Sequence, residues 1–210
     1  MNSARRNFTL ASAALALVTT FSSLPARADD ASDTQGIVDK ATVTVKAFAA
    51  DKEYVALPGL LAKAKAVLIY PQILEGGFVI GGSGGTGVLL VRDQKTGDFG
   101  SPAFYTMGGM SIGFLAGGQA AEVMLLINSQ KVVDSMLSTK VKLGAGVSIA
   151  AGPKGAGSSV AADIVSYAKA KGAFASMALE GQVIDVREKY NAAYYGKPAS
   201  PVDILVKKSV

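Results

Sequence analysis

The stretch GGFVIGGSGGTGVLLVRD, Gly76–Asp93, decides how the middle of this chain is interpreted. Within it, GSGGTG at Gly82–Gly87 fits the G-x-G-x-x-G pattern of dinucleotide-binding proteins. That pattern binds a pyrophosphate only where it joins a strand to the N-terminus of a helix. Here the apolar run Val88–Val91 and a turn follow it, and no Lys-Ser or Lys-Thr pair completes a P-loop. The sequence therefore predicts strands at this position and no nucleotide site.

Glycine is concentrated around this stretch, because residues 76–118 hold 14 of the chain's 24 glycines. Glycine weakens a strand, so its repeated use points to bulges, sharp bends or close approach of backbones. One explanation is that the strands curl tightly or pack a bare face against a helix. The other is that a glycine-lined surface admits a flat or lipid-like ligand. We favour the first explanation, because glycines in strands usually mark geometry.

The region before these strands reads as helical. Residues 29–34 are polar and predict a loosely ordered start of the domain. Residues 36–50 carry apolar side chains at intervals of three and four and predict an amphipathic helix. Pro58 is placed to open a short second helix, which would end near Ala66.

The rest of the chain predicts a β core with two further helices. Short apolar runs and alternating patterns predict strands at 66–71, 76–82, 86–93, within 101–128, at 140–152, 158–172 and 173–181. Helical spacing predicts an embedded helix at 129–139 and a short closing helix at 186–196. The expected fold is α+β. It has a glycine-rich, mostly antiparallel β core, sandwich or barrel-like, with an N-terminal helix, one embedded helix and a short C-terminal helix.

The N-terminus has the three parts of a secretory leader. Arg5 and Arg6 precede an apolar run of small residues, and Ala-Arg-Ala at 26–28 fits a cleavage site. We expect residues 1–28 to be a signal peptide and residues 29–210 to form one domain in the periplasm or envelope of a bacterium. The arginine pair also fits a twin-arginine signal, which would mean export after folding.

Composition limits the chemistry that this chain can carry. The net charge is +5, and removal of the three leader arginines would leave 18 basic and 16 acidic residues, so general nucleic-acid affinity is not expected. The sequence has no cysteine and no histidine, which removes the commonest nucleophile–base pairs and nearly all zinc sites. We therefore expect no enzyme, no metal or cofactor, and no nucleotide or nucleic-acid partner.

Lysines gather in the second half of the chain. Residues 140–171 hold Lys140, Lys142, Lys154, Lys169 and Lys171 against one acid, Asp163. Tyr167 would share a strand face with Lys169 and Lys171. If the strands that carry these lysines are neighbours, they form one surface, and each lysine would add about 1 kcal/mol of attraction to an anionic bilayer. Lysines on edge strands also prevent aggregation, which is an equally weighted explanation.

Three more basic residues, Lys63, Lys65 and Arg92, flank the first strands and complete the candidate lipid-binding set. Arg92 stands beside Asp93, so a local ion pair is its alternative role.

The order of motifs from Lys63 to Gly196 resembles the SYLF-domain family. The blocks are KAKAVLIYPQILEGGFVIGGSGGTGVLLVRD, SPAFYTMGGMSIGF, GQAAEVMLLI, GAGVSIAAGPKG, DIVSYAKAKGAFASMALEG and NAAYYG. The resemblance implies lipid binding: eukaryotic members bind phosphoinositides, fungal relatives also bind actin, and exported bacterial members are similar to envelope lipid-binding proteins. Members that bind phosphoinositides often use a basic N-terminal helix, whereas residues 36–50 carry only Lys40 and Lys46, so other anionic lipids are the expected ligands.

These observations predict a non-enzymatic lipid-binding protein of the bacterial envelope. It would bind anionic phospholipid head groups or a membrane surface through a lysine-rich face. The alternative is a structural or assembly role in the envelope, either as a homo-oligomer or with an outer-membrane partner. An enzyme that acts on lipid through Ser or Tyr ranks last, because no base stands ready in the sequence.

Overall fold

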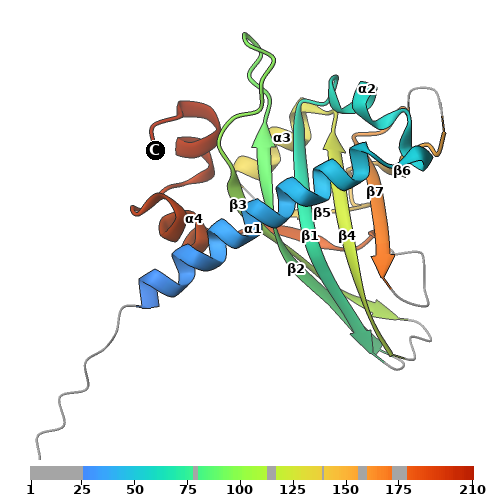
Figure 1. Ribbon diagram of the computed structural model, residues 1–210, viewed down its shortest axis with the longest axis horizontal. Coiled ribbons are helices and arrows are strands. Elements are labelled where there is room, and N and C mark those ends of the chain that lie inside the picture. The colour runs from blue at the N-terminus through green and yellow to red at the C-terminus, as the bar shows by residue number, and fades with distance from the viewer. Residues whose placement is uncertain (1–25, 78–79, 113–116, 139, 156–159, 172–178) are drawn as a thin grey trace, which may run out of the picture.

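A computed structural model describes residues 26–77, 80–112, 117–138, 140–155, 160–171 and 179–210 (Figure 1). The strands are β1 (Ala66–Gly77), β2 (Ile80–Val91), β3 (Ala103–Ile112), β4 (Gly117–Ile127), β5 (Val141–Lys142), β6 (Ile149–Ala151), β7 (Ile164–Lys171) and β8 (Val183–Val186). The helices are α1 (Ala26–Ala49), η1 (Lys52–Tyr54), α2 (Leu57–Leu61), α3 (Gln130–Ser138), α4 (Glu188–Tyr195) and the π-helical turn η2 (Asp203–Lys207).

All the strands belong to one curled sheet in the order β5-β8-β3-β2-β1-β4-β7-β6. Neighbouring strands are antiparallel except β6 and β7, which are parallel. The two edge strands, β5 and β6, are joined by residues 143–148 alone, so the sheet curls until its edges approach each other. The expected α+β fold with a mostly antiparallel, barrel-like sheet and helices at the start, in the middle and near the end is confirmed.

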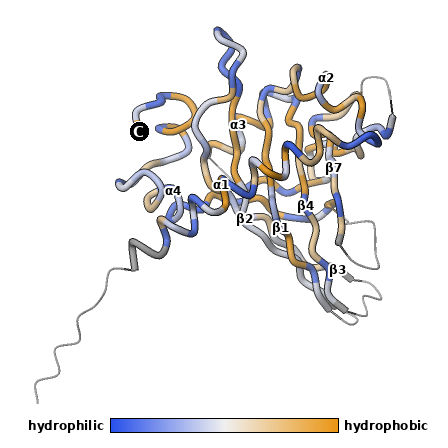
Figure 2. Tube along the Cα trace, viewed as in Figure 1, coloured by the Kyte–Doolittle hydropathy of each residue, from blue (hydrophilic) through white to orange (hydrophobic). Residues whose placement is uncertain are grey.

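Both faces of the sheet are covered, and this gives the protein two apolar cores. The inner face contributes Leu68, Tyr70 and Leu125 to a core closed by α3 and the C-terminal segment. The outer face contributes Val67 and Ile69 to a core under α1, η1, α2 and α4. Because neighbouring side chains point into different cores, residues 66–70 of β1 and 123–127 of β4 are apolar without alternation, and Figure 2 shows these parts of the two strands as hydrophobic.

The glycine motif lies inside a strand and not in a loop. Residues 82–87 belong to β2 and pair with both β1 and β3. A methyl group at Gly87 would overlap the carbonyl oxygen of Ile69 and lie 2.6 Å from Cδ1 of Tyr70. At Gly85 it would lie 3.0 Å from Cγ1 of Ile73. These two glycines allow the backbones of β1 and β2 to approach closely, which supports the geometric explanation of the motif.

Strand β1 does not end at Pro71, as the sequence had led us to expect. It continues to Gly77, and its register with β2 and β4 shifts between residues 69 and 73. The shift is a β-bulge. A proline is tolerated there because the extra residue of a bulge is left out of the hydrogen-bond ladder, so the N–H that proline lacks has no ladder partner to lose. The two predicted strands 76–82 and 86–93 are likewise one strand, β2.

The predicted single strand 140–152 is wrong. It divides into β5, which pairs with β8, and β6, which pairs with β7 at the opposite edge of the sheet. Gly144 and Gly146 have φ of 81° and 75°, so the chain turns between them. Apolar and polar residues alternate through this turn as they do in a strand. The sequence pattern therefore predicted one strand where the structure has two.

The remaining expectations concern the N-terminal residues and the predicted strand 173–181. Residues 29–34 are helical and not loosely ordered, because α1 already begins at Ala26. Most of the predicted strand 173–181 lies outside the described residues, and β8 follows it without having been predicted. The predicted leader, residues 1–28, lies outside the described residues except for 26–28, which start α1.

Candidate functional site

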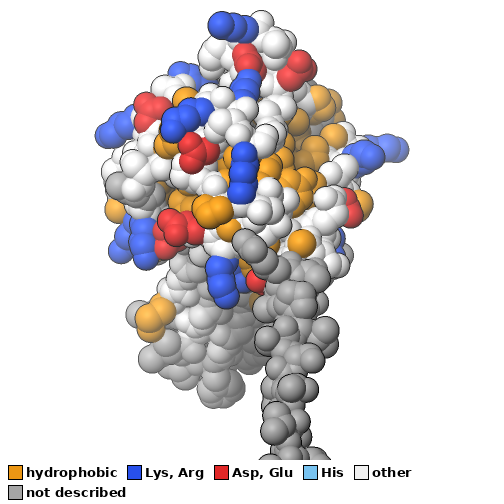
Figure 3. All heavy atoms as spheres, turned by 90° about the vertical axis from the view of Figure 1, so that its left-hand side faces the viewer, with side chains coloured by type: hydrophobic (Ala, Val, Ile, Leu, Met, Phe, Trp, Pro, Cys, Tyr) orange, Lys and Arg blue, Asp and Glu red, His pale blue; other side chains and the backbone are white. Residues whose placement is uncertain are grey.

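An apolar groove lies between α1 and the outer face of the sheet, and we call it the α1 groove. Its volume is about 330 Å³. Its walls include Val38 and Val45 of α1, Ile69 of β1, Leu90 of β2, Phe99 of the β2–β3 connection and Tyr194 of α4. A second hollow of about 250 Å³ shares Val45 and Phe99 with it and extends it below α2. Figure 3 shows exposed apolar side chains gathered on one face of the molecule with basic side chains beside them.

The groove follows from the residues that α1 places against the sheet. In the second half of the helix, Ala41, Thr44 and Phe48 are buried at intervals of three and four. Val38 and Val45 flank Ala41 by one helical repeat on each side and remain half-buried. Since Ala41 contributes only a methyl group, space remains between the helix and β1.

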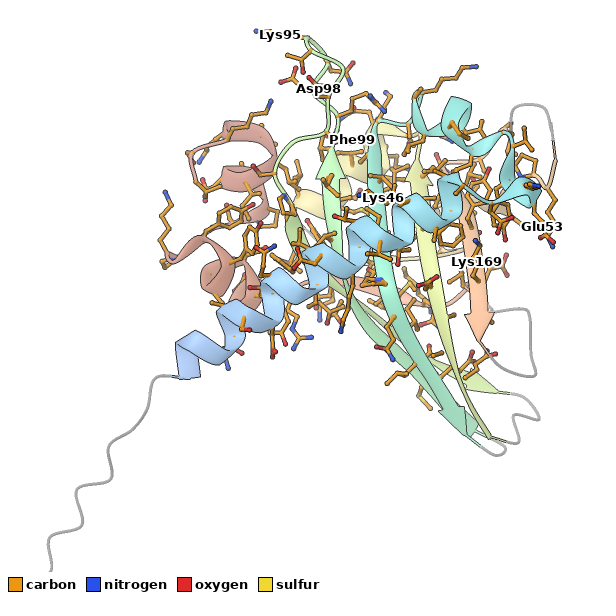
Figure 4. All side chains as sticks on the ribbon, viewed as in Figure 1. Lys46, Glu53, Lys95, Asp98, Phe99 and Lys169 are labelled. Atoms are coloured by element: carbon orange, nitrogen blue, oxygen red, sulfur yellow. The ribbon has the colours of Figure 1, made fainter. Side chains whose placement is uncertain are left out.

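One lysine stands directly at this groove. Lys46 lines it, is exposed, and lies next to Phe99 in Figure 4. Lys63, exposed, and Lys65, half-buried, follow α2, whose residues border the continuation of the groove. The apolar groove therefore has positively charged side chains at or near its opening. An anionic amphiphile requires this combination of an apolar cavity and a nearby positive charge.

Arg92 has a positioning role beside the groove. Its guanidinium donates to the carbonyl oxygens of Leu61 at 2.6 Å, Ala64 at 2.8 Å and Gly97, and stacks 4.2 Å from the ring centre of Phe99. These contacts fix the end of α2 and the β2–β3 connection relative to each other.

The predicted alternative, an Arg92–Asp93 pair, does not form. Asp93 pairs with Lys208 near the C-terminus. That contact, together with the backbone N–H groups of Lys95 and Thr96, lowers the pKa of Asp93 to about 2.

The lysines of residues 140–171 that the structure describes lie in two places, with Lys140 and Lys142 at β5 and Lys154 and Lys169 beside η1. Strand β5 pairs with β8 and strand β7 pairs with β4 and β6, so the strands that carry Lys142 and Lys169 are not hydrogen-bonded neighbours. Lys140 pairs with Asp185 at 2.8 Å, and Lys142 is exposed on β5. Lys154 pairs with Glu53 at 3.1 Å. The prediction of one lysine surface required that the strands carrying these lysines be neighbours. The turn at residues 144–146 instead leads the chain from β5 at one edge of the sheet to β6 at the other edge.

Lys169 is enclosed by the end of α1. Its ammonium lies 2.5 Å from a carboxylate oxygen of Asp51 and donates to the carbonyl oxygen of Ala47 at 3.2 Å. It also lies 5.0 Å from the ring centre of Phe48 and 5.7 Å from that of Tyr54. The hydrogen bond from Lys169 lowers the pKa of Asp51. Lys169 therefore provides a hydrogen-bond donor for a carbonyl group in the last turn of α1. Its ion pair with Asp51, the residue before η1, attaches η1 to the sheet.

Tyr167 is a core residue and does not lie at an interface. Its side chain is 1% exposed, meets Tyr54 edge-on at 5.0 Å, and is covered by Gly152. Burial raises the pKa of its hydroxyl. Lys171 ends β7, and its side chain lies outside the described part of the structure.

Comparison with known proteins supplies the family. The Ysc84 family model, described as Las17-binding protein actin regulator, matches residues 108–210. LAS seventeen-binding protein 3 of Saccharomyces cerevisiae is 32% identical over 167 residues, which is 75% of this chain and 36% of the relative. SH3 domain-containing YSC84-like protein 1 of Homo sapiens is 28% identical over 153 residues, which is 70% of this chain and 44% of the relative.

This chain belongs to the Ysc84, or SYLF, family. No solved structure matches it. The SYLF chain spans less than half the length of these curated relatives. The family model covers the region from β3 to the C-terminus, whereas α1, β1 and β2, which form most of the α1 groove, precede it.

Over the described ranges, no three His, Cys, Asp or Glu side chains gather to hold a metal ion. Among the helices described, none is long and apolar enough to cross a membrane. Sequence reasoning missed the α1 groove because five separate elements form its walls. The amphipathic pattern of residues 36–50 was its only signal.

Proposed function

We propose that this SYLF protein binds an anionic phospholipid, with an acyl chain in the α1 groove and the head group at the lysines beside it. The observation that carries the proposal is the apolar groove of about 330 Å³ with Lys46 in its wall. Each methylene that enters the groove would contribute about 0.8 kcal/mol. Lys46, Lys63 and Lys65 would each add up to about 1 kcal/mol of attraction to an anionic head group.

The proposed setting is the bacterial envelope, reached through the predicted leader. The family description names actin regulation, and the proposed export would separate this chain from actin. Family membership supports a binding role, since the family is described by what it binds and regulates. Binding of lipid without turnover is our proposal for this chain.

Vesicle flotation of Asp29–Val210 tests this function. We expect the chain to float with vesicles that contain phosphatidylglycerol, at low salt more than at high salt, and not with phosphatidylcholine alone. Lys46→Glu reverses one charge at the groove and should weaken binding by about tenfold or more. Lys142→Glu is the matched control, because Lys142 is also exposed but lies on edge strand β5 and does not line the groove.

Two results would overturn the proposal. Absence of flotation with anionic vesicles would remove the lipid role itself. Loss of binding in Lys142→Glu with full binding in Lys46→Glu would move the site to the strands predicted from sequence. Circular dichroism of each variant would confirm that the fold is intact.

Self-association is the second candidate function, and one observation favours it. Leu74 on β1 and Met110 on β3 are 57% and 79% exposed on the glycine-rich ends of these strands. Light scattering over a range of concentrations tests it. A concentration-dependent dimer that Met110→Asp dissociates would support assembly, whereas a constant monomer mass would exclude it.

A further inference from the structure

A second cleft lies on the opposite flank of α1, and we call it the bulge cleft. Its volume is about 410 Å³. Asp39, Lys40 and Val43 of α1 form one wall, and Gln72 of β1 and Glu122 of β4 lie in the other. The α1 groove is lined by different residues of the helix, Val38, Val45 and Lys46 among them, so the helix separates the two cavities.

The β-bulge of β1 creates this cleft. The extra residue between Tyr70 and Ile73 displaces the strand where β4 continues with small side chains, Ala120 and Ala121. Thr44 is only 1% exposed, and its hydroxyl donates to Oε1 of Glu122 at 3.4 Å. The cleft therefore has a fixed polar base, and bulges often occur beside binding sites.

The charges in the bulge cleft are not neutralised by their neighbours. Asp39 accepts a hydrogen bond from Gln35 at 2.8 Å, yet neither Asp39, Lys40 nor Glu122 forms an ion pair with another described residue. Lys169 is the cross-strand neighbour of Glu122, but its ammonium is held by Asp51. Two carboxylates and one ammonium thus line a cavity of ligand size without forming an ion pair to the described residues.

We propose that the bulge cleft binds a small zwitterion with an ammonium group a few bonds from a phosphate, as in a phosphoethanolamine group. Glu122 and Asp39 bind the ammonium, because two carboxylates favour a cation over the single positive charge of Lys40. Lys40 binds the phosphate. Val43 lies in the cleft wall and is 64% exposed. Its side chain contacts the carbon atoms that link the ammonium to the phosphate, or those attached to the phosphate.

This site goes beyond the lipid function proposed above and does not depend on it. The α1 groove selects a negative head group through lysines, whereas the bulge cleft selects a positive group through carboxylates. The same zwitterion occurs free and as a phospholipid head group, and the two sources present the same charges to the cleft.

Calorimetric titration of the full chain with free phosphoethanolamine tests the proposal. We expect saturable binding of phosphoethanolamine, weaker binding of ethanolamine, and none of inorganic phosphate. Glu122→Gln keeps the acceptor for Thr44 but removes the charge, and should weaken phosphoethanolamine binding at least tenfold. Glu188→Gln on α4 is the matched control, since it removes the same charge at an exposed position away from the cleft.

The variants separate the possible outcomes. Lys40→Gln should weaken phosphoethanolamine binding and leave ethanolamine binding unchanged. A further arm uses vesicles of phosphatidylcholine with and without phosphatidylethanolamine: loss of flotation in Glu122→Gln identifies a lipid source, and loss only in calorimetry identifies a free ligand. Absence of binding by the unaltered chain, or equal binding by Glu122→Gln and Glu188→Gln, overturns the proposal. Lys46→Glu tests the α1 groove separately, so the failure of one site does not imply failure of the other.

Discussion

Replacing Gly87 by alanine should destabilise the protein far more than replacing Gly82, although both belong to the same glycine motif. A methyl group at Gly87 would lie 2.6 Å from Cδ1 of Tyr70 and 2.9 Å from the carbonyl carbon of Ile69. Ordinary carbon contacts begin near about 3.5 Å, so the strands would have to separate by about 1 Å. Among the described residues, Gly82 has one neighbour within 4 Å of such a methyl group, the carbonyl oxygen of Gly109 at 3.9 Å, which is an ordinary contact.

The cost can be estimated from what would have to move. Tyr70 is fully buried and Ile69 pairs with strands on both sides, so neither can give way freely. Overpacking of this kind costs about 1–3 kcal/mol, and each ladder hydrogen bond lost adds about 1 kcal/mol. Gly87→Ala should therefore lower the free energy of unfolding by about 3 kcal/mol or more. Gly82→Ala should raise it by about 0.5 kcal/mol, because alanine restricts the unfolded chain.

Thermal unfolding followed by circular dichroism measures this difference. At about 2–4 °C per kcal/mol for a chain of this size, the two variants should differ in Tm by about 7–14 °C. Equal Tm values would refute the close approach of β1 and β2 at Gly87. A Gly82→Ala variant with unchanged Tm that no longer binds anionic vesicles would instead support the other explanation of the motif, a glycine-lined ligand surface.

The remaining predictions concern the C-terminal region. Gly196 ends α4 with φ of 68°, so Gly196→Ala should cost about 1 kcal/mol in urea unfolding, whereas Lys197→Ala beside it should cost little. Hydrogen bonds from Ser200 and Lys207 lower the pKa of Asp203 to about 2 from its ordinary 3.8. The stabilising effect of this carboxylate is therefore complete above about pH 4 and is lost as the pH falls towards about 2. Asp203→Asn should show a smaller fall in Tm over that range than the unaltered chain, and an equal fall would contradict the prediction.

The sequence predicted the fold class from local patterns. The embedded helix at 129–139 and the closing helix at 186–196 correspond to α3 and α4, and Gly196 caps α4 as expected. These elements were predictable because apolar spacing and a glycine cap are properties of neighbouring residues. The prediction of strands at the glycine motif also depended only on local context, since an apolar run and a turn follow Gly87.

Errors arose where the outcome depended on residues distant in sequence. Pro71 reads as a strand end, but pairing on both sides carries β1 through it as a bulge. Residues 140–152 keep the alternation of a strand, yet two glycines in the left-handed region divide them between opposite sheet edges. Lys169 reads as a surface charge, and only the packing of α1 and η1 shows that it is enclosed.

The amino-acid sequence by itself determined the fold class, the approximate position of the embedded and closing helices, that the glycine motif lies in strands, and which family the chain resembles. These conclusions rest on interactions within a few residues, which a linear pattern records. Only the tertiary structure decided which charges remain free and where cavities open. The α1 groove and the bulge cleft exist because α1 crosses strands that are brought together by long-range pairing, and a cavity is the space that those distant side chains leave unfilled.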